Sequence, residues 1–449
     1  MPDHPPVPGS DIRPWARPAV RGYLFLNANI VDVQEGNILE NASLITREGK
    51  IQSVSSSSPE SPLPPDLTVI DCEGRFLCPG LFDAHVHLCA VPGYKDLSKA
   101  FGNSDHSSLL RQPFVAAQML HRGFTSVRDC GGAQLPLKEA IDDVFPGPRL
   151  FISGHALSQF GGHGDLRGPH DQAECCGGLH SNNHLGRLCN GVPECMAAVR
   201  EEIRCGADFI KIMGSGGVAS PTDKLEHLQF TNAELQAMVE CADNAGTFVT
   251  AHAYTVKAIR HCIDNGVKGI EHGNFVDPAT AKLMAEKGVY LTPTLIAYAQ
   301  MASDQWKGYL PPESQEKNSQ VFESGLHALK IASEAGVKMC YGSDLLGPLG
   351  SAQTQEFALR SQVLSSLEIL RSATINPAKM MGWEESIGQI KDGFQADVVF
   401  LNKNPLDDVT VFDRPEEHVL GVMKDGRVCK SRWTTLKEDS EIPVRVKYN

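Results

Sequence analysis

Eight short apolar runs, separated by stretches with helical patterning, restrict the fold of this chain more than any other feature. They occupy residues 80–87, 125–128, 149–153, 209–213, 248–252, 269–272, 289–292 and 339–344. Each has roughly the four to eight residues that are usual for a buried strand. Apolar strands that alternate with helices favour a parallel sheet covered on both faces. We therefore predict an α/β fold whose eight strands close into a (β/α)8 TIM barrel.

Helix boundary signals support the alternation. Thr231-Asn232-Ala233-Glu234 is typical of a capping box and predicts a helix that ends at Gly246. Residues 255–265 predict a second helix, with Gly266 just beyond its end. An open doubly wound sheet is the alternative architecture, but no GxGxxG motif follows the first run.

Both ends of the chain carry short β-type runs broken by turn residues, which predict a small antiparallel sheet unit. The runs are 23–27, 42–47, 50–54, 68–71 and 76–78 near one end, and 397–401, 418–424 and 427–430 near the other. The simplest interpretation is one β-sandwich domain built from residues 23–78 and 385–449. The barrel domain, 79–384, would interrupt it, and a Pro-rich leader, 1–22, would precede it.

Charge and composition exclude several functions. The formal net charge is −13 and no Lys/Arg-rich run offsets it, so binding to nucleic acid or anionic lipid is not expected. No apolar stretch approaches the roughly 18 residues of a membrane span, and the leader lacks the apolar core of a signal peptide. The 13 cysteines, an odd number, fit reduced thiols in the cytoplasm better than a disulfide framework.

Polar residues at the ends of the predicted strands are the candidate site, because a TIM barrel has its active site at that rim. His85 and His87 end the first run, and their spacing of two places both on the same side, as two ligands of one metal require. A buried, hydrogen-bonded histidine pair would give the same motif. The motif alone is therefore weak evidence for a metal.

Lys211 lies toward the end of the fourth run, where its ammonium group would be desolvated unless it is paired, neutral or chemically modified. For a lone lysine, a salt bridge at the strand end is the simpler interpretation. The alternative is carbamylation by CO2, which would turn it into an anionic oxygen ligand that bridges two metals.

Three further candidates, His252, His272 and Asp344, end the fifth, sixth and eighth runs. Each has an ordinary alternative, a helix N-cap for Asp344 and a buried, hydrogen-bonded ring for the histidines. Together with the first three residues they fall at one rim of one predicted barrel. Chance placement does not explain that arrangement, so we predict a metal site.

These residues resemble the motifs of the amidohydrolase superfamily, and the resemblance covers about residues 23–430. The matching motifs are Pro79-Gly80-Leu81-Phe82-Asp83-Ala84-His85-Val86-His87, Lys211, His252, Glu271-His272-Gly273, Ser343-Asp344, Thr374-Ile375-Asn376-Pro377-Ala378 and Gly393-Phe394-Gln395-Ala396-Asp397-Val398. Within the superfamily the chain is similar to the ochratoxinase and Xaa-Pro or Xaa-Lys/Arg dipeptidase (imidazolonepropionase-like) branch. The motifs that indicate this are Gly161-Gly162-His163-Gly164-Asp165, Lys211-Ile212-Met213-Gly214-Ser215-Gly216-Gly217-Val218 and His252-Ala253-Tyr254.

The resemblance implies a centre with two divalent ions, expected to be zinc. His85, His87 and Asp344 would bind the more buried ion, His252 and His272 the second, and N6-carboxylated Lys211 would bridge them. A hydroxide that bridges the ions would attack an amide bond. Asp344 would take the hydroxide proton and deliver it to the leaving amine, and His163 or Tyr254 would donate to the scissile carbonyl group.

The expected substrate is a small molecule, a dipeptide or an N-acyl amino acid, and homo-oligomers are common in such folds. The same site would also suit a cyclic amide or a lactone, or a decarboxylation, although decarboxylation usually needs one metal and leaves Lys211 without a role. A non-catalytic scaffold is the alternative from another class. The six filled ligand positions argue against it.

Two other motifs do not indicate function. The run Gly214-Ser215-Gly216-Gly217 lacks the GK[ST] ending of a phosphate-binding loop. The residues Cys175, Cys176, His180, His184, Cys189 and Cys195 fit no structural zinc spacing. They lie in a Gly-, His- and Cys-rich insertion, 154–196, which is expected to be an irregular loop over the site, followed by a helix at 197–204.

Overall fold

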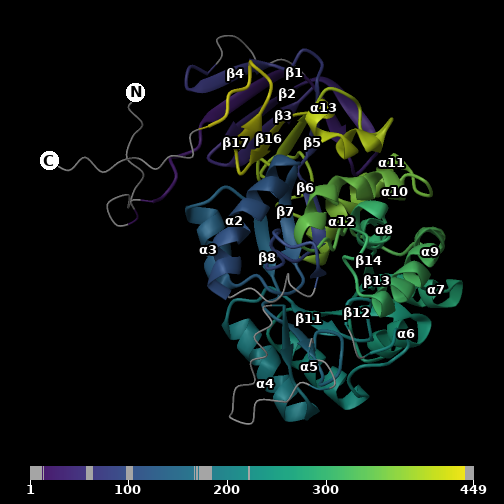
Figure 1. Cartoon of the computed structure of the whole chain (residues 1–449). Coiled ribbons are helices and arrows are strands. Elements are labelled where there is room, and N and C mark those ends of the chain that lie inside the picture. The colour runs from purple at the N-terminus through teal and green to yellow at the C-terminus, as the bar shows by residue number, and fades with distance from the viewer. Residues whose placement is uncertain are drawn as a thin grey trace.

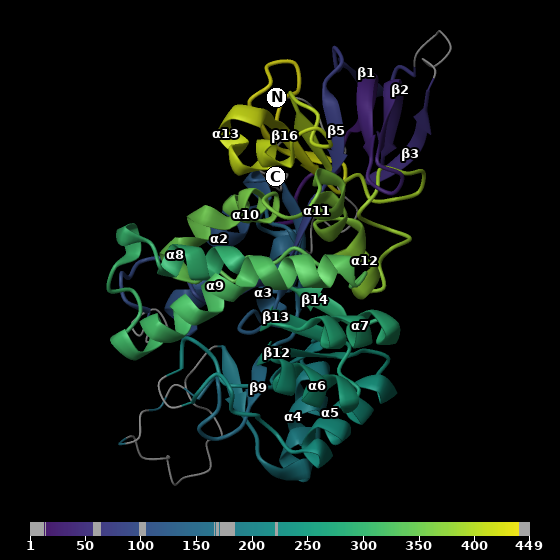
Figure 2. The same ribbon diagram turned by 90° about the vertical axis from the view of Figure 1, so that its right-hand side faces the viewer.

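The structure is a computed structural model, and it describes residues 13, 15–56, 64–97, 105–165, 167, 170, 185–220 and 223–439. Strands from both ends of the chain form one sheet, and the middle of the chain forms two parallel sheets with helices packed around them (Figure 1). Figure 2 shows helices between the end sheet and the parallel strands below it.

The end sheet has eight strands, in the order β17-β16-β15-β5-β1-β2-β3 with β4 beside β1. They are β1 (Gly22–Asp32), β2 (Asn37–Arg47), β3 (Lys50–Ser55), β4 (Leu67–Asp71), β5 (Phe76–Pro79), β15 (Val398–Leu401), β16 (Val419–Lys424) and β17 (Arg427–Ser431). The two ends of the chain meet where β5 pairs with β15. The expectation of a purely antiparallel unit is wrong, because β1 pairs in parallel with β4 and β5. The long segment between β3 and β4 allows the crossover that parallel pairing needs.

Parallel pairing in the middle of the chain agrees with the prediction. One sheet has the order β6-β7-β8 and the other the order β10-β9-β11-β12-β13-β14. The strands are β6 (Leu81–Val86), β7 (Phe124–Asp129), β8 (Arg149–Ile152), β9 (Ala156–Ser158), β10 (Gly186–Leu188), β11 (Ile210–Met213), β12 (Val249–Thr255), β13 (Gly269–Phe275) and β14 (Tyr290–Thr292). Every residue of β6, β7 and β11 is buried, as parallel strands covered on both faces require.

Helices connect these strands and cover them. They are α2 (Asp105–His121), α3 (Leu135–Asp143), α4 (Gly191–Arg204), α5 (Asn232–Asn244), α6 (Val256–Asp264), α7 (Pro278–Lys287), α8 (Leu295–Met301), α9 (Pro312–Glu334), α10 (Glu356–Arg360), α11 (Ser366–Ser372), α12 (Ile375–Met380) and α13 (Pro415–His418). The predicted capping box of α5 is confirmed, because Thr231 and Glu234 exchange both cap hydrogen bonds.

The eighth predicted strand, 339–344, is present only as one isolated bridge between Met339 and Leu291. Backbone hydrogen bonds still join this segment to the strands on both sides. Cys340 N donates to Leu291 O over 2.8 Å, and Ala84 N donates to Tyr341 O over 2.7 Å. No regular ladder continues, because the chain turns at Asp344, whose φ of 50° is left-handed rather than extended.

The insertion at 154–196 is more ordered at its two ends than predicted. It contains the short parallel strands β9 and β10, and α4 begins at Gly191 rather than near residue 197. Backbone pairing explains this, because Ala156 N donates to Leu185 O over 2.9 Å at the start of the two strands. Residues 171–184, with Cys175, Cys176, His180 and His184, lie outside the described residues.

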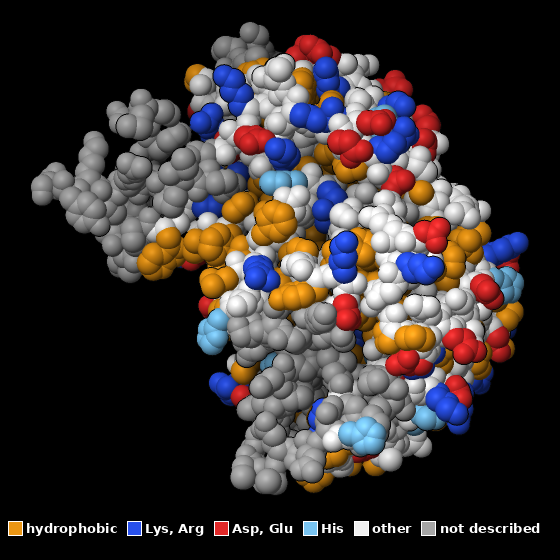
Figure 3. Space-filling view, viewed as in Figure 1, with side chains coloured by type: hydrophobic (Ala, Val, Ile, Leu, Met, Phe, Trp, Pro, Cys, Tyr) orange, Lys and Arg blue, Asp and Glu red, His pale blue; other side chains and the backbone are white. Residues whose placement is uncertain are grey.

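The surface carries side chains of both charges. On the face drawn in Figure 3, acidic and basic side chains are interspersed and no basic field stands out. Among the described residues, no helix has the length and apolar character needed to cross a membrane.

Candidate active site

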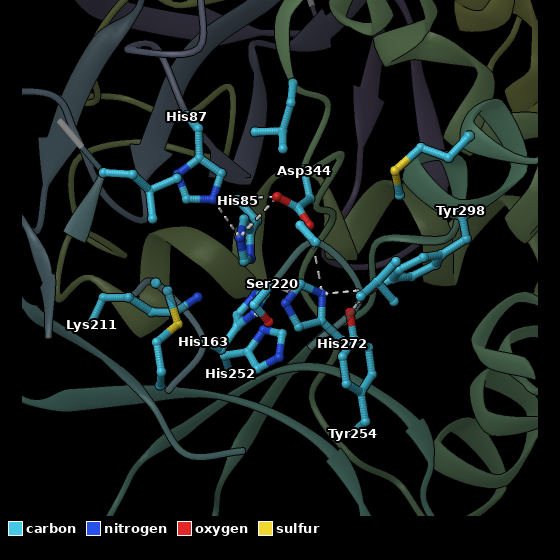
Figure 4. Close-up of a pocket in the computed structure, with 17 residues that line it drawn as sticks. His85, His87, His163, Lys211, Ser220, His252, Tyr254, His272, Tyr298 and Asp344 are labelled. Atoms are coloured by element: carbon cyan, nitrogen blue, oxygen red, sulfur yellow. Dashed lines mark hydrogen bonds and ion pairs between the residues drawn. The ribbon is translucent and has the colours of Figure 1, made fainter. Parts of the chain in front are cut away.

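One cavity lies at the C-terminal ends of the parallel strands (Figure 4). Strand register keeps these ends level, because Met213 lies beside His252 and Ala253 lies beside His272. The lining includes the eight residues that the sequence predicted for the site: His85, His87, His163, Lys211, His252, Tyr254, His272 and Asp344.

Three of these residues, His85, His87 and Asp344, point their ligand atoms at one another. The His85 Nε2 and His87 Nε2 atoms are 3.3 Å apart, and Asp344 Oδ1 lies 3.5 Å from the first and 3.3 Å from the second. Atoms bound tetrahedrally to one ion at the usual Zn–N distance would be about 3.4 Å apart. The spacing of this group therefore fits a single metal ion.

Hydrogen bonds at the far side of both rings decide which nitrogen carries the proton. His85 Nδ1 donates to Glu271 Oε2 over 2.7 Å, and His87 Nδ1 donates to the Gly131 carbonyl over 2.9 Å. Burial lowers the pKa of His85 to about 4, and Lys211 acts in the same direction, so this ring is neutral. His85 Nε2 is therefore an acceptor. Burial would lower the pKa of His87, but its contact with the Asp344 carboxylate raises it, so His87 Nε2 meets Asp344 through a proton unless a bound cation takes the place of that proton.

The Asp344 carboxylate is ionised. Burial alone would raise its pKa, but the neighbouring histidines, His85 first, outweigh burial and hold the pKa far below its usual value. Asp344 and His272 both have left-handed backbone, with φ of 50° and 72°. Few residues other than glycine adopt such angles, and those that do often lie at functional sites.

A second group lies next to the first. The His252 and His272 rings have centroids 4.6 Å apart, and the His85 and His272 centroids are 5.0 Å apart. His252 Nε2 donates to Gly216 O over 3.2 Å, which leaves Nδ1 as its ligand atom. Burial lowers the pKa of both His252 and His272 well below the usual value, so both rings are neutral and can bind a second ion.

Lys211 faces the same cavity from β11 and is 1% exposed. Its Nζ makes no hydrogen bond or ion pair with any other described residue, so the strand-end salt bridge is not found within the described chain. A buried ammonium group without a partner is costly. A positive charge at this position is therefore unfavourable unless another group balances it.

Two tyrosines border His272. Tyr254 OH and Tyr298 OH share a hydrogen bond of 2.9 Å, and Tyr298 OH lies 3.0 Å from His272 Nδ1. The predicted orientation of Tyr254 toward the cavity agrees with the structure, but its hydroxyl group binds Tyr298, which the sequence analysis missed. Tyr298 lies in α8, beyond the residues that directly follow β14, so its position relative to a strand did not single it out.

The two motifs that were set aside take structural roles. Gly214 and Gly216 let the backbone pass close to its neighbours, since a β-carbon added at either glycine would overlap other atoms. Cys189 and Cys195 are buried in the large hydrophobic core. The other four residues considered with them lie outside the described residues; they are Cys175, Cys176, His180 and His184.

Comparison with known proteins gives the family. Residues 76–429 match the model of the amidohydrolase family. The ochratoxinase of Aspergillus niger is 33% identical over 420 residues, which cover 90% of this chain and 86% of that protein.

Two solved structures are also similar to this chain. A crystal structure of an amidohydrolase is 42% identical with a TM-score of 0.86, and the match covers 91% of this chain and 98% of that one. A prolidase complexed with N-methylphosphonate-L-proline is 40% identical with a TM-score of 0.87, covering 92% and 100%. The chain belongs to the amidohydrolase family and is a hydrolase that acts on amide bonds.

Proposed function

We propose that this protein is a binuclear metal-dependent hydrolase that cleaves the amide bond of a dipeptide or an N-acyl amino acid. The observation that carries the proposal is the convergence of three possible ligand atoms, from His85, His87 and Asp344, at the spacing of one metal ion. A divalent ion supplies Lewis acidity, which activates water and polarises a carbonyl group.

The proposal of a second ion depends on three residues, His252, His272 and Lys211. His252 offers Nδ1 and His272 lies within ring contact of both His85 and His252. We propose that Lys211 is carboxylated on Nζ and bridges the two ions, because a buried ammonium group without a partner would otherwise be unfavourable there. Zinc is the proposed metal, since histidine nitrogen and carboxylate oxygen are its usual ligands.

The remaining residues of the cavity orient the substrate and move protons. Asp344 Oδ2 is the proposed atom that accepts a proton from the attacking water and returns it to the leaving amine, because Oδ1 faces His85 and His87. His163 and Tyr254 are proposed to border the scissile carbonyl group. Tyr298 fixes the Tyr254 hydroxyl group through their shared hydrogen bond.

The substrate class is supported by the cavity wall and by the relatives. Apolar side chains of Met213, Val218 and Leu346 line the cavity beside the candidate ligands. They suit an apolar group next to the scissile bond. The related prolidase was crystallised with N-methylphosphonate-L-proline, a compound with an apolar ring.

We further propose that the two parallel sheets form one closed barrel of residues 79–384, and that the end sheet belongs to a β-sandwich domain of 23–78 and 385–449. The hydrogen bonds of residues 340 and 341 to the strands on either side support the closure. A homo-oligomer is supported by exposed apolar side chains on α2, where Leu110 is 81% and Phe114 is 62% exposed.

The proposal is tested by metal analysis and a substrate screen on protein produced with zinc and bicarbonate. We expect two equivalents of zinc per chain and hydrolysis within a panel of dipeptides, N-acyl amino acids and lactones. Protein without metal that hydrolyses none of these compounds would contradict the proposal.

Replacement of Lys211 tests the bridge. Lys211→Ala is expected to lose the second zinc ion and the hydrolytic activity, and added formate or acetate should restore part of both by supplying a free carboxylate. Metal content and hydrolysis rate are the measurements. Lys268→Ala is the matched control, because Lys268 precedes β13 at the other end of the strands and its side chain is 61% exposed. Full activity in Lys211→Ala would exclude the bridging role.

A further inference from the structure

The chain after β11 folds back beside the cavity as a loop that we name the clamp loop, residues 214–220 and 223–230. Its two arms pair, because Ser215 bridges Leu228 and Gly216 N donates to His227 O over 3.0 Å. Ser220 and Val218 of this loop line the cavity. The clamp loop therefore forms part of the wall that a substrate would meet.

A buried carboxylate organises the clamp loop. Asp223, 3% exposed, accepts hydrogen bonds from Gly217 N over 3.0 Å and from Gln229 Nε2 over 3.3 Å, and a third from the Ser220 hydroxyl group. A carboxylate has no proton to donate, so Asp223 accepts all three of these hydrogen bonds. The single hydroxyl proton of Ser220 therefore points at Asp223.

The direction of the Ser220 hydroxyl proton determines which nitrogen of the His163 ring carries a proton. His163 Nδ1 lies 2.7 Å from Ser220 Oγ, and because the Ser220 proton is already used, Oγ accepts and Nδ1 donates. Nε2 has no hydrogen-bond partner among the described residues and is the ring atom left for a substrate. Asp223, Ser220 and His163 thus form a chain with one defined proton direction.

The His163 ring is also held by packing. One face stacks on His252, with centroids 4.2 Å apart and planes at 28°. The backbone of Gly217 lies so close that a β-carbon there would overlap the ring. The His163 backbone is tied to the same loop, since its N–H donates to Gln229 Oε1 over 3.0 Å.

A lysine from another element fastens the clamp loop. Lys317 of α9 donates from Nζ to Gly217 O over 3.1 Å, Ser220 O over 3.1 Å and Asp223 O over 2.6 Å. These three carbonyl groups match the three protons of an ammonium group. The side chain is 18% exposed, so the contacts are largely shielded from water.

We propose that Ser220, Asp223 and Lys317 are positioning residues that hold His163 with its proton on Nδ1 and Nε2 toward the substrate. Ser220 and Asp223 fix the ring, and Lys317 fixes the loop that contains them. The inference rests on the proposed function in that His163 borders the scissile bond. Because Nε2 carries no proton, it would accept a hydrogen bond from the substrate, so Tyr254 rather than His163 would donate to the scissile carbonyl group. The geometry of the loop itself does not depend on the reaction.

Hydrogen–deuterium exchange tests the clamp without any substrate. Peptides that cover 214–230 are expected to exchange about 10-fold faster in Lys317→Met than in the unaltered protein, because each lost bond to a charged donor loosens the loop. Lys330→Met is the matched control, a lysine of the same helix with a side chain 61% exposed. Equal exchange in Lys317→Met and Lys330→Met would overturn the role of Lys317.

A proton-sensitive measurement tests the ring. The measurement is the NMR spectrum of protein labelled with ¹⁵N-histidine. The signals that are missing from the spectrum of His163→Asn belong to His163, and they should show that the proton is on Nδ1. Ser220→Ala should shift these signals, while Ser220→Thr, which keeps the hydroxyl group, should preserve them. A proton on Nε2 in the unaltered protein would contradict the proposed direction.

Kinetics then test the consequence for catalysis. Ser220→Ala is expected to lower kcat about 10-fold to 100-fold with unchanged zinc content, and Ser220→Thr should recover most of it. Unchanged kcat in Ser220→Ala, in an enzyme that hydrolyses the panel, would overturn the positioning role alone. An inactive unaltered protein would instead contradict the proposed function. The exchange and labelling experiments would still show whether Lys317 holds the clamp loop and Ser220 holds the His163 ring.

Discussion

Glu271 lies behind the candidate metal ligand His85 and is not among the residues that line the cavity. Its Oε2 accepts from His85 Nδ1, while Oε1 accepts from Arg128 over 2.6 Å and from the Thr250 hydroxyl group. Burial would raise the pKa of Glu271, but Arg128 and His85 together hold it well below its usual value. A carboxylate behind a ligating histidine fixes the ring and makes it a better ligand.

Glu271→Gln is expected to weaken zinc binding about 10-fold to 100-fold. The same change should lower the free energy of unfolding by about 3 to 5 kcal/mol, because Arg128 stays buried without a counter-charge. Competition with a zinc chelator and urea denaturation measure the two effects separately.

The double variant Glu271→Gln, Arg128→Met separates the two roles. Removing both charges should return much of the stability and none of the metal affinity. Recovery of zinc binding in the double variant would show that Glu271 does not act through His85.

Elements with strong local signals could be predicted from the sequence, and elements defined by tertiary contacts could not. The α5 capping box and the apolar strands β6, β7, β8 and β11 have local causes, hydrogen bonding at a helix start and burial on both faces. The segment 339–344 looked like a strand by composition. Its conformation is decided by the turn that brings Asp344 to His85.

The same distinction applies to the site. The candidate ligands lie in or next to apolar runs of the sequence, so their position in these runs was enough to select them as candidates. Ser220, Asp223 and Lys317 act on His163 from a loop and from a distant helix, and no sequence spacing links them. Tyr298 lies in α8, which the sequence analysis did not predict as an element.

His418, the last residue of α13, should make stability depend on pH. Burial lowers the pKa of His418 below 6.5, and Lys403, Arg414 and Arg432 act in the same direction against Glu417. The folded protein therefore binds this proton more weakly than the unfolded chain, and stability is lost as the pH falls through the unfolded value.

His418→Asn should remove this part of the pH dependence. Between about pH 7.5 and pH 5.5, the variant is expected to lose less free energy of unfolding than the unaltered protein. Urea denaturation at each pH gives the difference, and His327→Asn, at an exposed position of α9, is the control. An equal loss in all three proteins would exclude His418 as a contributor.

Across the whole molecule, Arg149 joins the parallel strands to the end sheet. From the start of β8 its guanidinium group donates to Asp397 Oδ2 over 2.6 Å and to Asp425. Burial raises the pKa of Asp397, and Arg149 is the main opposing influence. The two parts of the molecule are thus connected by a largely buried ion pair.

Arg149→Met is expected to lower the free energy of unfolding by about 3 kcal/mol, because Asp397 stays buried without its partner. Zinc content should not change, since Arg149 begins β8 and the cavity lies at the strand ends. Denaturation and metal analysis are the measurements. Arg204→Met removes an exposed ion pair and should cost less than about 1 kcal/mol, and an equal cost for both variants would contradict the role of Arg149.

The pairing of β5 with β15 sets an order of events during protein synthesis. Strands β1 to β5 leave the ribosome early, but β15 follows only after most of the chain has been made. At about 5 to 20 residues per second, the edge of β5 waits on the order of tens of seconds for its partner. During that interval Phe25 and Leu77 lack the cover that Phe400 gives them in the finished protein. Chaperones that shield unpaired strand edges during synthesis should therefore raise the yield of folded protein.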